Sequence, residues 1–397
     1  MWSDPEEANS AWHPHVPDYV LRLLRSHPDA LPIAEGDLAD AVVLFADVAG
    51  FTPMSEALAG SGRYGTEELS RIMNNWFDTM SGRVAESGGS VVEFQGDALV
   101  AVFDHIPEER AVTVRRAVQC ALAMQSRMDR FQPVATQAGP FHVEMKVGVG
   151  AGPLLQTVMG DADHRLGCVQ IGPALERAVA AEHHAEAGEV VVGAALLHAH
   201  PGVRLLDRDD GWSVVSGVDG PTAALRRTAD LHLDHRAATR LAPFLHPAVA
   251  ERLRSGRRDL VNEHRQVTAV FVGMPSVAAD DREAVAALQG YLAAALRLVA
   301  QYGGNFRHIA VGDRDSVLVA FFGAPISHED DQERAVRCSL DLLQLPGGPF
   351  RVGVGTGAAY CGEVGTDRRR EYAVIGDSVN LAARLMQSAA AGQVLID

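Results

Sequence analysis

One glycine-rich sequence occurs twice in the chain, first as Lys146-Val147-Gly148-Val149-Gly150-Ala151-Gly152 and again as Arg351-Val352-Gly353-Val354-Gly355-Thr356-Gly357. Both copies have the apolar alternation of a β-strand. Similar landmarks surround each copy in the same order. A fixed order of repeated landmarks indicates one domain present twice.

Five pairs of landmarks carry this repeat. They are the apolar strands at 41–45 and 267–271, the Gly-Gly pairs at 88–89 and 303–304, the hairpin strands at 99–103 and 318–322, Arg-Ala-Val-X-Cys at 116–120 and 334–338, and Ile-Gly at 171–172 and 375–376. The first half also has an apolar stripe at helical spacing from Leu69 to Val84. Each half therefore reads as strand, helix, hairpin, helix, strand, helix, strand. This order predicts an α+β fold of two ferredoxin-like domains.

The repeat also suggests the domain boundaries. We expect an N-terminal strap at residues 1–37, a first domain at 38–225, a linker at 226–264 and a second domain at 265–397. The second copy stops about thirty residues earlier than the first. We therefore expect it to be truncated, with further C-terminal domains in a longer natural chain.

Composition excludes several classes of protein. The 397 residues include 35 basic and 51 acidic side chains, a net charge of −16, which argues against general binding to nucleic acid or anionic lipid. We see no membrane span and no secretory signal, and the four cysteines show no metal-binding spacing. We expect a cytoplasmic protein with reduced thiols.

Two carboxylates in the first half are candidates for metal binding. Asp47 ends a strand in the sequence Phe45-Ala46-Asp47-Val48-Ala49-Gly50-Phe51-Thr52-Pro53, where we expect Thr52 to cap the following helix. Asp97 lies in a Gly96-Asp97 hairpin turn. Each motif alone also fits an ordinary turn. Together, the two acids predict a clamp for two divalent ions, with phosphate oxygens received by loop N–H groups.

The second half has different chemistry. Gly273 stands where the first half has Asp47, so the metal acids are not both repeated. Instead, Asp377 is placed to cap a helix on which Asn380 and Arg384 share one face. An amide beside a guanidinium suits a ribose and a phosphate, although a solvated polar stripe explains this helix alone. The two halves have divided the chemical groups between them.

These residues resemble the class III nucleotidyl cyclases. Residues 45–52 look like the first metal motif, 96–98 like the second, and 379–384 like the transition-state motif. Residues 265–272 and 371–376 most resemble the soluble, tandem-domain, bicarbonate-responsive adenylyl cyclases. The resemblance implies two halves packed head to tail as a pseudo-dimer, with ATP in a cleft between them.

The resemblance also implies a role for each site residue. Asp47 and Asp97, with the Val48 backbone, would hold two Mg²⁺ or Mn²⁺ ions, and Asn380 and Arg384 would act on the ribose and α-phosphate. The triphosphate would be bound by a separate set of residues: Lys146, Ala49, Gly50, Phe51 and Thr52. The product would be cyclic AMP.

Some positions depart from the pattern of those cyclases. The adenine-reading lysine aligns with His308, or with Arg307, and the position of its partner, usually Asp or Thr, is Ala373 here. The resemblance implies that the backbone at Ala373 and Val374 would read the adenine edge. Two halves packed head to tail would also form a second, pseudo-symmetric cleft. There Glu93 replaces the lysine linked to bicarbonate, and Val179 replaces an arginine, with Arg177 nearby. We therefore expect no response to bicarbonate. A nucleotide-sensing module without turnover and a cyclase for another nucleotide remain alternative functions.

Overall fold

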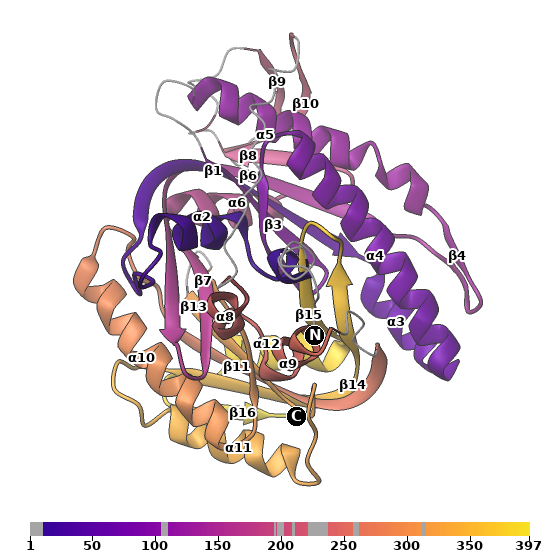
Figure 1. Ribbon diagram of the computed structural model, residues 1–397. Helices are drawn as coiled ribbons and strands as arrows, with labels where there is room; N and C mark the ends of the chain where they lie inside the picture. The colour runs from indigo at the N-terminus through magenta and orange to yellow at the C-terminus, as the bar shows by residue number, and fades with distance from the viewer. Residues whose placement is uncertain are drawn as a thin grey trace.

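The computed structural model describes residues 11–104, 110–193, 196, 202–208, 211–220, 237–256, 262–311 and 315–397. The expected domain limit at 225 and parts of the strap and linker lie outside these residues. Figure 1 shows the first half, in indigo to magenta, packed against the second half, in orange to yellow.

The first half is a mixed sheet with helices on its faces. Its elements are β1 (Asp37–Ala49), α3 (Phe51–Ala59), α4 (Gly62–Glu86), β2 (Ser90–Gln95), β3 (Ala98–Asp104), α5 (Arg110–Gln125), η3 (Met128–Phe131), β4 (Val134–Thr136), β5 (Gly139–Phe141), β6 (Glu144–Asp161), β7 (Arg165–Ile171), α6 (Pro173–His183), β8 (Val190–Gly193), β9 (Val203–Asp207) and β10 (Trp212–Val218).

The second half repeats most of these elements. They are β11 (Glu263–Pro275), α10 (Arg282–Gln301), β12 (Asn305–Val311), β13 (Asp315–Phe322), α11 (Asp331–Leu342), β14 (Arg351–Gly365), β15 (Arg370–Ile375), α12 (Asp377–Ser388) and β16 (Val394–Ile396). The first sheet has the order β2-β3-β1-β6-β8-β10-β9 with β7 on β6, and the second has β12-β13-β11-β14-β15 with β16 on β14. The matching order confirms the tandem α+β fold.

The repeated glycines bring a helix close to the central strand. A Cβ added to Gly148 would lie 2.4 Å from the backbone nitrogen of Glu182 in α6, and one added to Gly353 would lie 2.2 Å from that of Met386 in α12. Real Cβ atoms do not approach this closely. The glycines of both copies therefore let α6 and α12 lie directly on β6 and β14.

Helix α4 covers one face of the first sheet, as its apolar stripe predicts. Leu69, Met73, Trp76, Phe77 and other stripe residues are almost completely buried. The Trp76 and Phe77 rings meet edge to face at 5.0 Å between centroids. Burial of this stripe, at about 25 cal/mol per Å² of apolar surface, is the main force that holds α4 on the sheet.

Strands β6 and β14 each continue beyond their own sheet as an arm paired with β7 or β15. The β14–β15 arm crosses to the first half, where Tyr360, Val364, Ala373 and Ile375 join the same core as α4. In the opposite direction, Leu154 and Leu155 of the β6 arm share a core with α10. The sequence order missed these arm hairpins, because a bent strand has no separate signal.

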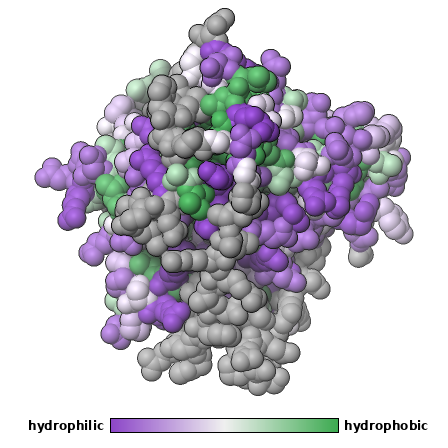
Figure 2. All heavy atoms as spheres, turned by 90° about the horizontal axis from the view of Figure 1, so that it is seen from above, coloured by the Kyte–Doolittle hydropathy of each residue, from purple (hydrophilic) through white to green (hydrophobic). Residues whose placement is uncertain are grey.

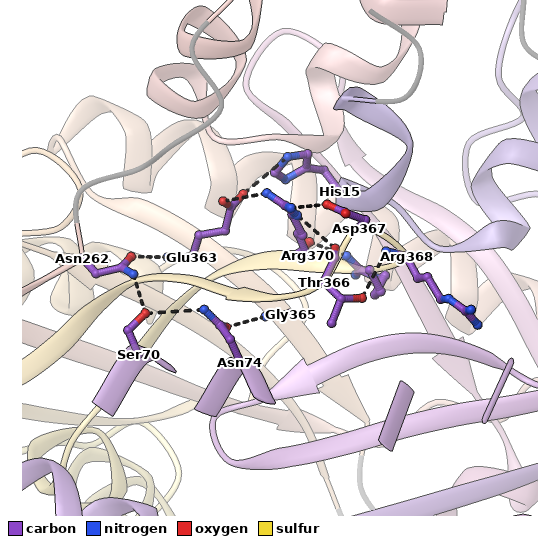
Figure 3. Close-up of polar contacts among 11 residues, drawn as sticks. His15, Ser70, Asn74, Asn262, Glu363, Gly365, Thr366, Asp367, Arg368 and Arg370 are labelled. Atoms are coloured by element: carbon purple, nitrogen blue, oxygen red, sulfur yellow. Dashed lines mark hydrogen bonds and ion pairs between the residues drawn. The ribbon is translucent and has the colours of Figure 1, made fainter. Parts of the chain in front are cut away.

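Polar contacts fix the β14–β15 arm on α4 (Figure 3). Asn74 accepts a hydrogen bond from the Gly365 N–H at 3.1 Å. Asn262 donates to the Ser70 hydroxyl at 2.6 Å and accepts from the Glu363 N–H at 3.0 Å. These bonds join α4 of the first half to the arm of the second half, so they set how the halves face each other.

A small helical cluster lies beside the two domains. It contains η1 (His13–His15), α2 (Asp18–Ser26), α8 (Ala237–Leu241), η4 (Ala242–Phe244) and α9 (Pro247–Arg254). Apolar side chains of both segments, including Leu24, Phe244 and Leu253, form one buried cluster against Val158 and Leu166 of the first half. The expected strap and linker thus contact each other, and the strap contains a helix.

The coloured part of the face drawn in Figure 2 is largely polar. Figure 2 shows one face that is mostly hydrophilic, with small separate hydrophobic areas. Helix α10 is long and apolar enough to cross a membrane, but Leu288, Leu292 and Val299 on one of its faces are buried in the shared core. The four cysteines are all unpaired.

Candidate functional site

Asp47 and Lys146 lie directly opposite each other on neighbouring strands. The antiparallel register of β1 and β6 pairs these two residues, while β1 and β3 pair Ala46 with Leu99. The Gly96-Asp97 turn therefore lies next to Asp47 at the same edge of the sheet. Both aspartates and Lys146 are half-buried, so the fold brings these three predicted residues together.

Both aspartates have raised pKa values. Burial, followed by repulsion from Asp47, raises the pKa of Asp97 to about 7. Burial also raises the pKa of Asp47, opposed by the Val48 N–H and by the charges of Lys146 and His183. A divalent cation would offset the repulsion between the two carboxylates, so these residues fit the implied metal ions.

In the described part of the chain, Asp47 and Asp97 are not joined by a third side chain in a metal-binding cluster. Among the residues that the structure describes, no group of three or more His, Cys, Asp or Glu side chains forms a metal site. Further oxygen ligands would come from the Val48 carbonyl, the nucleotide or water, as is usual for Mg²⁺ at phosphate sites. The described side chains accordingly offer two carboxylate ligands, Asp47 and Asp97, to such an ion.

The loop after Asp47 differs from its prediction at the helix start. Helix α3 begins at Phe51 and Gly50 is its N-cap, with φ 112° and no side-chain cap. The predicted capping by Thr52 is therefore wrong. A Cβ on Gly50 would lie 2.4 Å from the His142 carbonyl oxygen, so only glycine fits this turn. Ala49, Gly50, Phe51 and Thr52 present the helix N-terminus at the site.

Asn380 and Arg384 lie on α12 and are exposed. The Arg384 side chain is 64% exposed and lies 3.4 Å from Asp377 of the same helix. Gly376 is the N-cap, with no side-chain hydrogen bond, so the predicted cap by Asp377 is wrong. Within the described residues, no hydrogen bond or ion pair joins Asn380 or Arg384 to Asp47 or Asp97. Their predicted catalytic roles stay predictions.

The predicted base-reading residues are partly placed. Arg307 is the extra residue of a bulge in β12; it donates to the Phe94 carbonyl at 2.9 Å and pairs with Glu371 at 2.6 Å. Ala373 and Val374 are buried in β15. The His308 side chain lies outside the described residues. Since Arg307 is engaged at the interface, it is poorly placed to read a base.

The equivalent of the metal site in the second half is closed. A Cβ on Gly273 would lie 2.7 Å from the Met386 sulfur and 2.9 Å from the Arg351 Nε. These two side chains occupy the space that an aspartate would need. The second half therefore has neither the carboxylate nor the room for one.

The residues of the predicted pseudo-site have different surroundings. Arg177 is exposed and donates to the Ala151 carbonyl at 2.6 Å, and Val179 packs against the shared core. Glu93 lies in a buried cluster with Arg307, Arg369 and Glu371. Burial, followed by Glu371, raises the pKa of Glu93 to about 8. A cavity of about 90 Å³ adjoins this cluster and Arg165.

Sequence reasoning missed two groups of charged residues. Glu182 of α6 is 5% exposed and interacts electrostatically with Asp47 and Lys146. Arg165 is half-buried and Arg369 is buried, and both line the cavity with Glu93; they belong to hairpin arms whose positions the sequence did not reveal. For Glu182 a signal existed: it lies on the same helix face as Ala174 and Ala178, which pack on the sheet.

Comparison with known proteins agrees with this geometry. The model of the adenylate and guanylate cyclase catalytic domain matches residues 34–204 and 343–397, together more than half of the chain. Human adenylate cyclase type 10 is 25% identical over 88% of this chain, and an adenylate cyclase of Mycobacterium tuberculosis is 30% identical over 43% of this chain and 41% of its own length.

The chain spans about a quarter (24%) of the length of the human relative. Among solved structures, a class III adenylyl cyclase-like ATP-binding protein from Pseudomonas aeruginosa superposes with a TM-score of 0.62, at 14% identity, over 100% of this chain and 92% of its own. At that identity the likeness shows the fold alone. Because the family model matches more than half of the chain, the chain belongs to the adenylate and guanylate cyclase catalytic domain family.

Proposed function

We propose that this protein is an adenylyl cyclase that converts ATP to 3′,5′-cyclic AMP and pyrophosphate. One observation carries the proposal: Asp47 and Asp97 form a crowded carboxylate pair beside Lys146, at a strand end that continues into a helix N-terminus. Anionic phosphates and their metal ions suit such a site. The adenylate cyclases among the relatives favour ATP as the substrate.

Asp47 and Asp97 would hold Mg²⁺ or Mn²⁺ at this strand end. When bound, such ions lower the pKa of a hydroxyl and neutralise phosphate charge. The chain's own groups would do the rest: Lys146 and the N–H groups of residues 49–52 bind and orient the triphosphate. This placement aligns the ribose 3′-oxygen with the α-phosphorus, while Asn380 and Arg384 of α12 approach from the second half.

The reaction exchanges one bond for another at the α-phosphorus. The 3′-hydroxyl gives its proton to solvent water, its oxygen bonds to the α-phosphorus, and the bond from that phosphorus to the β-bridging oxygen breaks, releasing pyrophosphate. Negative charge grows on the α-phosphate oxygens as this happens. We propose that Arg384 stabilises that charge and that Asn380 orients the ribose.

The second candidate function is an ATP-binding module without turnover. The exposed position of Arg384 favours this alternative, because its side chain is 64% exposed and pairs with Asp377 of its own helix. Cyclic AMP formation separates the two candidates. We expect the purified protein to form cyclic AMP with Mn²⁺ or Mg²⁺ and to stop on addition of a chelator. Saturable ATP binding without product would support the module instead.

His308 offers a test of base selectivity. An ordinary imidazole, with a pKa of about 6.5, is mostly neutral at pH 7 and donates more weakly than a lysine ammonium. We expect His308→Lys to raise the preference for ATP over GTP by about tenfold, measured as the ratio of kcat/KM values. Arg307→Lys is the matched control. An unchanged ratio in His308→Lys would show that this residue does not contact the base.

Bicarbonate should not stimulate the enzyme. Arg307 and Arg369, the cations nearest Glu93, are engaged with Glu371 and with backbone carbonyls. At a pH above the Glu93 pKa of about 8, its carboxylate also repels an anion. Turnover measured in bicarbonate and in chloride, at one such fixed pH, should be equal. A clear rise with bicarbonate would contradict this expectation.

A further inference from the structure

Helix α6 places a buried acidic residue, Glu182, beside the strands of the proposed metal site. Its last turn lies on β6 at Gly148, where an added Cβ would be 2.4 Å from the Glu182 nitrogen and 3.0 Å from its Cα. Gly148 is two residues from Lys146 and therefore on the same face of the strand. Lys146 in turn is opposite Asp47. Glu182 is thus next to both residues.

The side chain of Glu182 is turned inward toward these charges. The residue is only 5% exposed. Its carboxyl interacts electrostatically with Asp47 and Lys146 and lies 3.9 Å from the Nε2 of the exposed His183. Lys146 therefore interacts with two carboxylates, those of Asp47 and Glu182.

The second half provides a comparison within the same chain. The same helix and strand pack there in the same way, with Met386 over Gly353 where the first half has Glu182 over Gly148. Gly273 replaces Asp47 in that half, and the Met386 sulfur lies where an aspartate would begin. The first half thus has both acids, Glu182 on the helix and Asp47 on the strand, whereas the second half has neither at the equivalent positions.

We propose that Glu182 is a positioning residue of the metal site, which draws the Lys146 ammonium group away from Asp47 and so leaves Asp47 available to a divalent cation. The inference rests on the proposed metal role of Asp47 and Asp97. Glu182 is not itself proposed as a ligand, because the described residues contain no cluster of three metal-binding side chains. Without Glu182, Lys146 would pair with Asp47 and compete with the metal.

The test measures Mn²⁺ binding to the nucleotide-free protein, by the loss of the free Mn²⁺ signal in electron paramagnetic resonance. The variants are Glu182→Gln, Glu182→Met, Lys146→Met and the double variant Glu182→Gln/Lys146→Met. We expect either Glu182 variant to weaken Mn²⁺ binding by about tenfold, as is typical for residues that support metal ligands. In the Lys146→Met background, Glu182→Gln should have no effect.

The dependence on Lys146 separates this role from a structural one. Glu182→Met introduces the residue that packs at the equivalent position of the second half, and thermal unfolding checks that each variant is folded. Equal losses with and without Lys146, or no loss in either Glu182 variant, would overturn the inference. Asp47→Asn tests the proposed metal site separately: Mn²⁺ binding unaffected by that change would contradict the site itself.

Discussion

Replacement of Asp47 by asparagine should reduce cyclic AMP formation by about a thousandfold. The change keeps the size of the side chain but removes its charge. Loss of a carboxylate ligand removes several kcal/mol of stabilisation from the developing phosphate charge, and each 1.4 kcal/mol corresponds to about tenfold in rate. Initial rates with saturating ATP, at increasing Mn²⁺, measure the loss and show whether excess metal restores activity.

Asp40 provides the matched control for this experiment. It lies on the same strand, β1, and makes a surface ion pair with Arg110 at 3.4 Å. Exposed pairs of this kind contribute little to stability. Asp40→Asn should therefore retain activity. Full activity in Asp47→Asn, or equal losses in both variants, would show that Asp47 has no special role in turnover.

Replacement of Arg384 by alanine should lower kcat by about a hundredfold or more and change KM little. The proposed contact forms as charge grows on the α-phosphate, so it stabilises the transition state more than bound ATP. The side chain is 64% exposed, and its loss should change the free energy of unfolding by no more than about 0.5 kcal/mol. Steady-state kinetics together with thermal unfolding separate these two effects.

Arg337 is a suitable control for Arg384. It is also an exposed helical arginine of the second half, 67% exposed and paired with Glu333 of its own helix at 2.6 Å. Arg337→Ala should leave kcat unchanged. Arg384→Lys should recover part of the lost rate, because a lysine restores the charge but not the planar fork of donors. A kcat for Arg384→Ala within twofold of the unchanged protein would favour the ATP-binding module.

The fold could be predicted because its signals are local and occur twice. The apolar stripe from Leu69 to Val84 and the strands around Gly148 and Gly353 each fix an element, and their common order fixes the tandem α+β fold. The Gly96-Asp97 turn was also predicted, since two residues between apolar strands favour a tight hairpin.

The parts that failed depend on contacts between distant segments. Gly50 is the N-cap of α3, in place of Thr52, because the His142 carbonyl leaves room only for glycine there. Arg307 pairs with Glu371 of another strand of the second half and donates to the Phe94 carbonyl of the first half, contacts that no local pattern reveals. The helical spacing of Glu182 indicates that it faces the sheet, but its partners, Asp47 and Lys146, come from strands β1 and β6, which are distant in sequence.

The division of the site between the halves also has a physical basis. The first half keeps Asp47, Asp97 and Lys146 together, whereas Met386 and Arg351 fill the equivalent space beside Gly273. A filled space of this kind has no room for a metal ion. Each chain therefore carries the groups for one proposed catalytic cleft, with α12 supplying Asn380 and Arg384.

The most direct test of the proposed activity is to identify the product by mass spectrometry. The purified protein would be incubated with ATP, GTP, CTP and UTP in separate reactions, each with Mg²⁺ and with Mn²⁺. We predict 3′,5′-cyclic AMP and pyrophosphate from ATP, in equal amounts and only with metal. ATP that is bound but returned unchanged under both metals, or a cyclic product from another nucleotide in preference to ATP, would contradict the proposed function.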